Sequence, residues 1–190
     1  MKEELIIASE NRGKIQEAQE ILSNYNIIPM RDYDIQIEVD EDKETFEENA
    51  IKKAETIAKI LEGRKCIADD SGIEIEYLGG FPGVQTKRWF KGTDRERNIA
   101  IIEKLKGVPK EKRNIKFITA IAVSNGKNTI SAVGEISGKV SEEPIGENGF
   151  GFDEIFELPN GKTLAELSAE EKNKISARKI ALENLKNKMC

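Results

Sequence analysis

The stretch that decides the fold class is residues 5–22, which read LIIASENRGKIQEAQEIL. Leu5 to Ala8 form a continuous apolar run, typical of a short and fully buried strand. Apolar residues then recur at helical spacing from Ile15 to Leu22. Asn11 is a suitable N-cap for that helix. The chain is therefore predicted to begin with a strand, a tight turn and a helix.

Capping boxes mark the starts of three further helices, because each pairs a Ser or Thr with a Glu three residues later. They are Thr45-Phe-Glu-Glu48, Thr93-Asp-Arg-Glu96 and Ser168-Ala-Glu-Glu171. The helix after the third box is predicted to run to the end of the chain as one element. Its apolar stripe would consist of Ile175, Leu182 and Leu185.

The strands are predicted from buried runs and alternation. Cys66 to Ala68 should be a buried strand that runs into the turn Asp69-Asp70-Ser71-Gly72, with a second strand through Ile73 and Ile75. Residues 117–123 and 129–140 should form a hairpin, and residues 34–42 an acidic strand or extended loop. This mixture predicts one α/β domain over residues 1–190, a mixed sheet flanked by helices.

Composition excludes several classes of function. The 190 residues include no histidine, so Ser-His-Asp triads, Cys-His nucleophiles and HExxH zinc sites are impossible. Acid–base work would fall to carboxylates, lysine, tyrosine or metal-bound water. The net charge of −5 argues against a broad face that binds a nucleic acid polymer.

Two cysteines, Cys66 and Cys190, are too few for a disulfide framework or a four-cysteine metal site. No apolar run is long enough for a signal peptide or a membrane span. The sequence is therefore expected to be that of a cytoplasmic protein that does not enter membranes.

The turn after the first predicted strand is a candidate anion site. Backbone N–H groups at a helix start, together with Lys14, can bind phosphate. The turn is not a P-loop, since Ala8 stands where that motif needs its first glycine. An ordinary capped turn is an equally good interpretation of this segment alone.

Asp69 and Asp70 are the second candidate. Neighbours on a strand point to opposite faces, so one carboxylate can face a pocket while the other braces the turn. A carboxylate there suits a Mg²⁺ ligand or a base for water. Taken alone, an Asx-turn with exposed acids is the more common arrangement.

Other segments are weaker candidates, each with a structural alternative. The acids from Glu38 to Glu44 could supply an oxygen ligand or form a solvated segment. The aromatic rings of residues 150–153 could stack on a base or belong to the core. Lys53, Lys172 and Arg178 could bind a ligand or simply face solvent.

Five ordered motifs resemble the inosine triphosphate pyrophosphatase family over roughly residues 5–185. This family hydrolyses non-standard purine nucleoside triphosphates such as ITP, dITP and XTP. The matching segments are Ser9-x-Asn11-x-x-Lys14, Asn49 to Ala54, Asp69 to Ile75 with Leu78 to Gly83, Gly149 to Asp153, and Ala165 to Arg178.

The resemblance implies an elongated α/β fold of two lobes with a central cleft, and a homodimer. It also implies Mg²⁺-dependent cleavage of the triphosphate to the monophosphate and pyrophosphate, which cleanses the nucleotide pool. Asp70 would be the catalytic base and, with Glu41, a metal ligand. The positions implied to bind substrate are Ser9, Asn11, Gly13, Lys14, Lys53, Ser71, Phe150, Gly151, Phe152, Asp153, Lys172 and Arg178.

The chain departs from the family pattern at four positions. Glu10 replaces the usual glycine, Phe152 replaces Tyr or Trp, and Gln85 stands where an aromatic residue is common. Ala177 replaces the histidine that the resemblance implies reads the purine 6-oxo group. Because alanine cannot donate a side-chain hydrogen bond, weaker base discrimination is expected.

Two alternatives remain open at this point. The first is a pyrophosphatase of altered or relaxed base specificity. The second is a nucleotide-binding protein without catalysis, which the retained acids and lysines disfavour.

Overall fold

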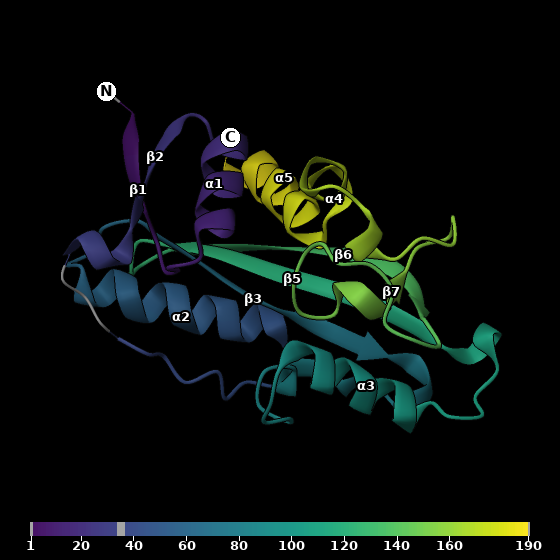
Figure 1. Ribbon diagram of the computed structural model, residues 1–190. Helices are drawn as coiled ribbons and strands as arrows, with labels where there is room; N and C mark the ends of the chain where they lie inside the picture. Colours follow the sequence, from purple (N-terminus) through teal and green to yellow (C-terminus); the bar gives the residue numbers. More distant parts are fainter. Residues whose placement is uncertain (1, 34–36, 190) are drawn as a thin grey trace. The chain divides into compact units, whose positions relative to one another are not determined.

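The computed structural model describes residues 2–33 and 37–189. Its helices are α1 (Arg12–Ile21), α2 (Phe46–Ile60), α3 (Asp94–Lys104), α4 (Ala169–Ile175) and α5 (Ala177–Met189) (Figure 1). Its strands are β1 (Glu3–Ile7), β2 (Tyr25–Pro29), β3 (Cys66–Ile75), β4 (Phe81–Pro82), β5 (Asn114–Ser124), β6 (Thr129–Val140) and β7 (Phe156–Glu157).

The strands form a mixed sheet, which confirms the predicted fold class. Their order is β2-β1-β3-β5-β6-β7, with β4 paired to β3. Strand β1 runs parallel to β2 and to β3, whereas the β3–β4 and β6–β7 pairs are antiparallel. Parallel pairs need crossover connections, and α1 and α2 provide them.

The chain divides into two compact units, which are described separately below. Unit 1 consists of residues 1–71, 118–135 and 177–190, and unit 2 consists of residues 72–117 and 136–176. No helix in the described parts of the chain has the length and apolar character needed to cross a membrane.

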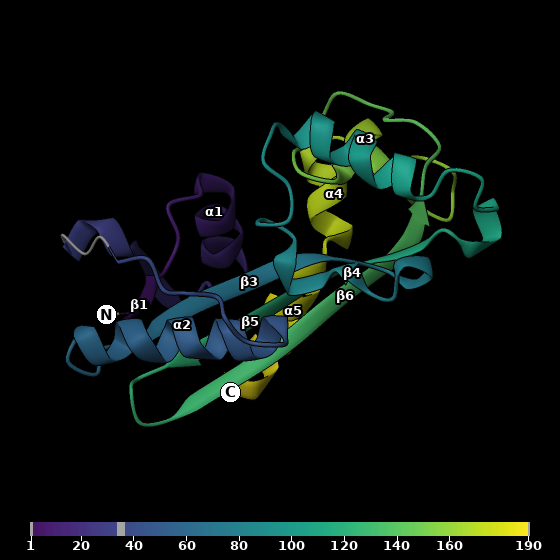
Figure 2. The same ribbon diagram turned by 90° about the horizontal axis from the view of Figure 1, so that it is seen from below.

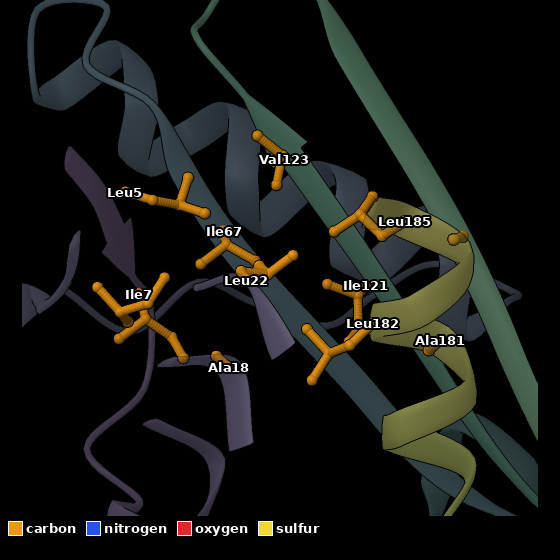
Figure 3. Packing of buried hydrophobic residues seen from close by; sticks show 12 residues of the cluster. Leu5, Ile7, Ala18, Leu22, Ile67, Ile121, Val123, Ala181, Leu182 and Leu185 are labelled. Carbon is orange, nitrogen blue, oxygen red and sulfur yellow. The ribbon is translucent and has the colours of Figure 1, made fainter. Parts of the chain in front are cut away.

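In unit 1, helices cover both faces of the sheet. Helices α1 and α5 lie on one face, and their apolar side chains pack with Leu5, Ile7, Ile67 and Ile121 (Figure 3). Helix α2 lies on the other face, as the ribbon in Figure 2 shows from below. It packs against residues such as Ile6 and Cys66. Because strand side chains alternate, consecutive residues of β1 and of β3 belong to different cores.

In unit 2, α3 packs on the sheet through Ile101 and Leu105, both completely buried. Residues Ile73 and Ile75 of β3 and Phe156 of β7 belong to the same core. The capping box at Thr93 is present, with hydrogen bonds in both directions between Thr93 and Glu96. The boxes at Thr45 and Ser168 are also confirmed.

Two predicted boundaries are wrong. Residues 66–75 form one continuous strand instead of two strands around a turn. Both of its ends are held by neighbouring strands, since Cys66 and Ile67 pair with β1 while Glu74 and Ile75 pair with β4. These ladder pairings override the turn tendency of the sequence Asp69 to Gly72.

The predicted last helix is in fact two helices, because Ser176 is extended (φ −70°, ψ 146°). Ile175 is 38% exposed and does not belong to the buried stripe that contains Leu182 and Leu185. Helix α4 has no buried residue, whereas α5 buries one face in unit 1. The two segments therefore differ in burial and form two separate helices.

The acidic segment of residues 34–42 is only partly described, since residues 34–36 lie outside the described ranges. Residues 37–42 form no strand, so the extended-loop alternative holds for that part.

Candidate active site

The candidate site of unit 1 lies beyond the carboxyl end of β1, beside Asp69 and Asp70 in the middle of β3. Strand β1 has β2 on one side and β3 on the other, and the crossovers α1 and α2 cover opposite faces. Strand order therefore reverses between β1 and β3. In open α/β sheets, ligands bind beside such a switch point, outside the carboxyl ends of the strands.

The turn after β1 is organised by its own side chains. Asn11 is the N-cap of α1, and its Oδ1 accepts hydrogen bonds from the backbone N–H groups of Gly13 (2.9 Å) and Lys14 (3.2 Å). Ser9 Oγ accepts from the Asn11 N–H at 3.2 Å. The cap is confirmed, but these particular N–H groups donate to Asn11, so an anion would have to displace that side chain. Glu10 is exposed.

Asp69 forms ion pairs with two cationic side chains on the face of the sheet that α1 and α5 cover. Its Oδ2 accepts from Lys14 Nζ at 2.8 Å and from Arg178 Nη1 at 2.6 Å. Arg178 Nε also pairs with Glu17 Oε2 at 3.1 Å. Burial by itself would raise the pKa of the Asp69 carboxyl. The charges of Arg178 and Lys14 more than offset it and hold that pKa well below its usual range.

Asp70 faces α2 instead, as the alternation along β3 predicts. Its Oδ2 accepts from Asn49 Nδ2 at 3.0 Å, and its Oδ1 accepts from the Ser71 N–H at 2.9 Å. Asn49 is 1% exposed, and its Oδ1 accepts from the Lys43 N–H at 2.9 Å. This buried amide therefore ties the acidic loop before α2 to the Asp70 carboxylate.

Lys53 lies one turn after Asn49 on α2 and makes a similar connection. Its Nζ donates to Glu41 Oε1 at 2.5 Å and to the Asp69 carbonyl oxygen at 3.1 Å. Residues four apart share a helix face. One face of α2 thus contacts the Glu41 carboxylate, the Asp69 carbonyl oxygen and the Asp70 carboxylate.

The donor set suits a hard divalent cation. Glu41 and Asp70 offer carboxylate oxygens, the ligands that Mg²⁺ prefers. Within the described residues no three His, Cys, Asp or Glu side chains gather as a cation cage. Mg²⁺ commonly binds through one or two carboxylates with substrate phosphates and water completing its shell. The residues present therefore fit Mg²⁺ held jointly by protein and substrate.

The second candidate site, in unit 2, is the loop of residues 149–153. Phe150 is 63% exposed, a large aromatic ring open to solvent. Asp153, itself 1% exposed, accepts through Oδ2 from the Phe150 N–H at 2.8 Å and from Lys172 Nζ at 2.5 Å. The Lys172 ammonium lies 4.3 Å from the centre of the Phe150 ring. Ring, cation and carboxylate thus form one cluster.

The two aromatic residues of this loop have different environments. Phe152 is 3% exposed and belongs to the core of unit 2, so its ring does not line a surface there. Arg97 lies over that ring at 4.7 Å. The alternative that a loop aromatic belongs to the core is therefore correct for Phe152 and incorrect for Phe150.

The predicted site residues fall into two groups. Ser9, Asn11, Gly13, Lys14, Glu41, Lys53, Asp70, Ser71 and Arg178 belong to unit 1, and Phe150, Gly151, Phe152, Asp153 and Lys172 belong to unit 2. Placing Lys172 and Arg178 on one helix is wrong, since they lie on α4 and α5. Ala177 is the first residue of α5 and is buried.

Sequence reasoning assigned no site role to Glu17 or Asn49, and it named Asp69 as a candidate without identifying its two cationic partners. A signal existed for each of them. Asp69 alternates with Asp70 on the strand, Glu17 lies three residues after Lys14 on α1, and Asn49 lies four residues before Lys53 on α2.

Comparison with known proteins shows what the whole chain is similar to. The dITP/XTP pyrophosphatase of Bacillus subtilis (strain 168) is 45% identical over 188 residues, covering 96% of this chain and 94% of the relative. That of Shouchella clausii (strain KSM-K16) is 44% identical with the same coverage.

Solved structures match over almost the whole length. The Staphylococcus aureus Ham1 protein matches with a TM-score of 0.91 at 37% identity, covering 98% of each chain. A HAM1 protein from Coxiella burnetii gives 0.90 at the same identity and coverage. The model of the Ham1 family matches residues 5–188. Since the family model, the relatives and the fold agree over almost the whole length, the chain belongs to the Ham1 family.

Proposed function

We propose that this chain hydrolyses non-standard purine nucleoside triphosphates, such as ITP, dITP and XTP, to the monophosphate and pyrophosphate. The names of its relatives, dITP/XTP pyrophosphatases, support this substrate class. The observation that carries the proposal is the pair of acids on β3. Asp70 is held by a buried amide, and Asp69 gathers two cations on the opposite face.

Asp70 is the proposed proton acceptor. The Asn49 amide and the Ser71 N–H donate to its two oxygens and so fix the orientation of the carboxylate. The water oxygen forms a bond to the α-phosphorus, and the bond from that phosphorus to the α–β bridging oxygen breaks. The water proton passes to Asp70, and pyrophosphate leaves with the electron pair of the broken bond.

The triphosphate charge must be neutralised for this reaction. Lys14 and Lys53 supply positive side chains for it, and the polar turn of Ser9, Asn11 and Gly13 would line the phosphates. Bound Mg²⁺, held by Glu41, Asp70 and the phosphates, would supply further neutralisation of charge.

The base is proposed to stack on Phe150, the exposed ring of the loop that also contains Gly151, Phe152 and Asp153. Lys172 would donate to a base acceptor, because its ammonium already lies beside that ring. The family resemblance also implies a contact with the base for Arg178, which belongs to unit 1. The two carboxylates of Glu17 and Asp69 hold its planar guanidinium group in place.

A release assay tests the proposal. Purified protein is given ITP, XTP, dITP, GTP and ATP with and without Mg²⁺, and the products are resolved as monophosphate plus pyrophosphate. Asp70→Asn is expected to lower kcat by at least about 100-fold, the usual contribution of a general base. Asp42→Asn, an exposed acid of the same unit, is the matched control and should retain activity. Binding without turnover by the wild-type protein would overturn the proposal.

We also propose that the protein forms a homodimer, on the basis of the family resemblance. We propose a cytoplasmic location because its buried free cysteine suits a reducing compartment. Sedimentation equilibrium at several protein concentrations tests the dimer. A single species of 21.3 kDa throughout would contradict it.

A further inference from the structure

The start of α3 contacts both polar groups of one residue in the 149–153 loop. Asp94 Oδ2 accepts from the Gly151 N–H at 2.7 Å, and Asn98 Nδ2 donates to the Gly151 carbonyl oxygen at 2.9 Å. Asp94 and Asn98 are four residues apart, so they share a face of the helix. Two side chains of one helix therefore hold the two peptide units that flank the Cα of Gly151. All of these residues belong to unit 2.

These contacts fix the backbone immediately after the exposed ring of Phe150. The Phe150 N–H already donates to Asp153, so three hydrogen bonds restrain two consecutive residues. Gly151 has a positive φ of 68°. Glycine adopts positive and negative φ about equally readily, so the residue by itself does not select this conformation. The contacts from α3 therefore restrain Gly151 in addition to the hydrogen bonds that the loop makes within itself.

The packing of α3 does not require this polar pair. Ile101 and Leu105 already anchor the helix in the core of unit 2. Asn98 is completely buried, and its Oδ1 has no hydrogen-bond partner, which costs free energy. A leucine would fill similar space without that cost. The amide is thus explained by the hydrogen bonds that it donates, to the Gly151 carbonyl oxygen at 2.9 Å and, more weakly, to Glu154 Oε2 at 3.5 Å.

We propose that Asp94 and Asn98 are positioning residues for base recognition, which fix the Gly151 backbone and through it the ring of Phe150. The inference rests on the proposed function, because it takes Phe150 as the surface on which the purine stacks. Neither residue touches the reacting phosphorus. Their loss should therefore weaken binding of the base while leaving the chemical step nearly unchanged.

The test uses Asp94→Ala and Asn98→Leu in the full chain, with Glu103→Ala as a matched control. Glu103 is an exposed acid near the other end of α3 and has no contact with the loop. Asp94→Ala also removes the ion pair with Arg97, and Asn98→Leu also removes the weaker hydrogen bond to Glu154. Loss of the hydrogen bond to Gly151 predicts a rise in KM for ITP of about 3- to 10-fold, with kcat within about twofold of wild type. Asp94→Asn retains an acceptor oxygen for the Gly151 N–H and should restore most of the affinity.

Two further measurements separate positioning from a general loss of structure. Amide exchange followed by NMR should be faster at Gly151 in Asp94→Ala, by at least about tenfold, and unchanged in the control. Trp89 is the single tryptophan and belongs to unit 2, so its fluorescence reports the unfolding of that unit. The unfolding temperature measured in this way should be the same in Asn98→Leu as in wild type. An unchanged KM in both variants, or a fall in kcat with unchanged KM, would overturn the inference.

Failure of the proposed function gives a different pattern. If the wild-type protein turns over no triphosphate, that function is wrong, and inosine monophosphate is then titrated by calorimetry as the probe. Weaker binding in the two variants than in wild type and control supports the positioning role. Equal binding, or none to any of the four proteins, overturns it.

Discussion

Replacing Asp69 by asparagine is the sharpest test of how unit 1 is held together. The substitution keeps the shape of the side chain but removes the charge that Lys14 and Arg178 share. The side chains of Asp69, Lys14 and Arg178 are only 9%, 17% and 13% exposed, so water cannot readily replace the lost carboxylate. Arg178 would keep its ion pair with Glu17, but the two cations would lose the carboxylate that they share.

The magnitude follows from that burial. Removing one partner of a buried ion pair costs about 3–5 kcal/mol of unfolding free energy, because the remaining charge stays desolvated. For a chain of this length each kcal/mol lowers Tm by about 2–4 °C. Asp69→Asn is therefore expected to lower Tm by about 6–20 °C.

The assay is differential scanning calorimetry in EDTA, so that no bound metal contributes. Asp42→Asn is the matched control, because Asp42 Oδ1 accepts from Lys52 Nζ at the same 2.8 Å as the Lys14–Asp69 pair. The Asp42 side chain is 58% exposed, and exposed pairs contribute little, so Tm should stay close to wild type. Equal small shifts for both variants would refute the reasoning from burial.

Three further predictions concern the packing of unit 1. Burial raises the pKa of the Cys66 thiol to about 12. In a Cys190→Ser background, where Cys66 is the single thiol, the native protein should therefore react with a disulfide reagent at least about 100-fold more slowly than the unfolded chain. Since this folded-state pKa exceeds the unfolded value, the contribution of the thiol to stability is complete below pH 9.0 and lost as the pH rises toward 12. Urea unfolding of wild type and Cys66→Ala from neutral to alkaline pH measures it, and a difference that does not change with pH would contradict it. At Gly134, an added Cβ would lie 2.2 Å from the Ala177 carbonyl oxygen, so Gly134→Ala should lower stability by about 2–3 kcal/mol. An unchanged urea midpoint would contradict the close approach of β6 to α5 at this position.

Much of the local structure could be predicted because its causes lie within a few residues. The capping boxes at Thr45, Thr93 and Ser168 and the cap at Asn11 each use a side chain and a backbone group of the same turn. The opposite orientation of Asp69 and Asp70 needed only the period of a strand.

Predictions failed where distant segments decide the outcome. The sequence Asp69 to Gly72 has the composition of a turn, but pairing with β1 and β4 keeps the strand continuous. The break at Ser176 arises because α5 buries one face while α4 buries none. Neither cause is visible in the spacing of nearby residues.

By itself, the sequence determined the α/β class, the helix starts and the acids and lysines available for chemistry. Only the tertiary structure decided their partners: Asp69 with Lys14 and Arg178, Asp70 with Asn49, and Gly151 with Asp94 and Asn98. The physical reason is that capping and periodicity act within one turn or strand. The partner of a buried charge or peptide group is set by which distant elements pack against it.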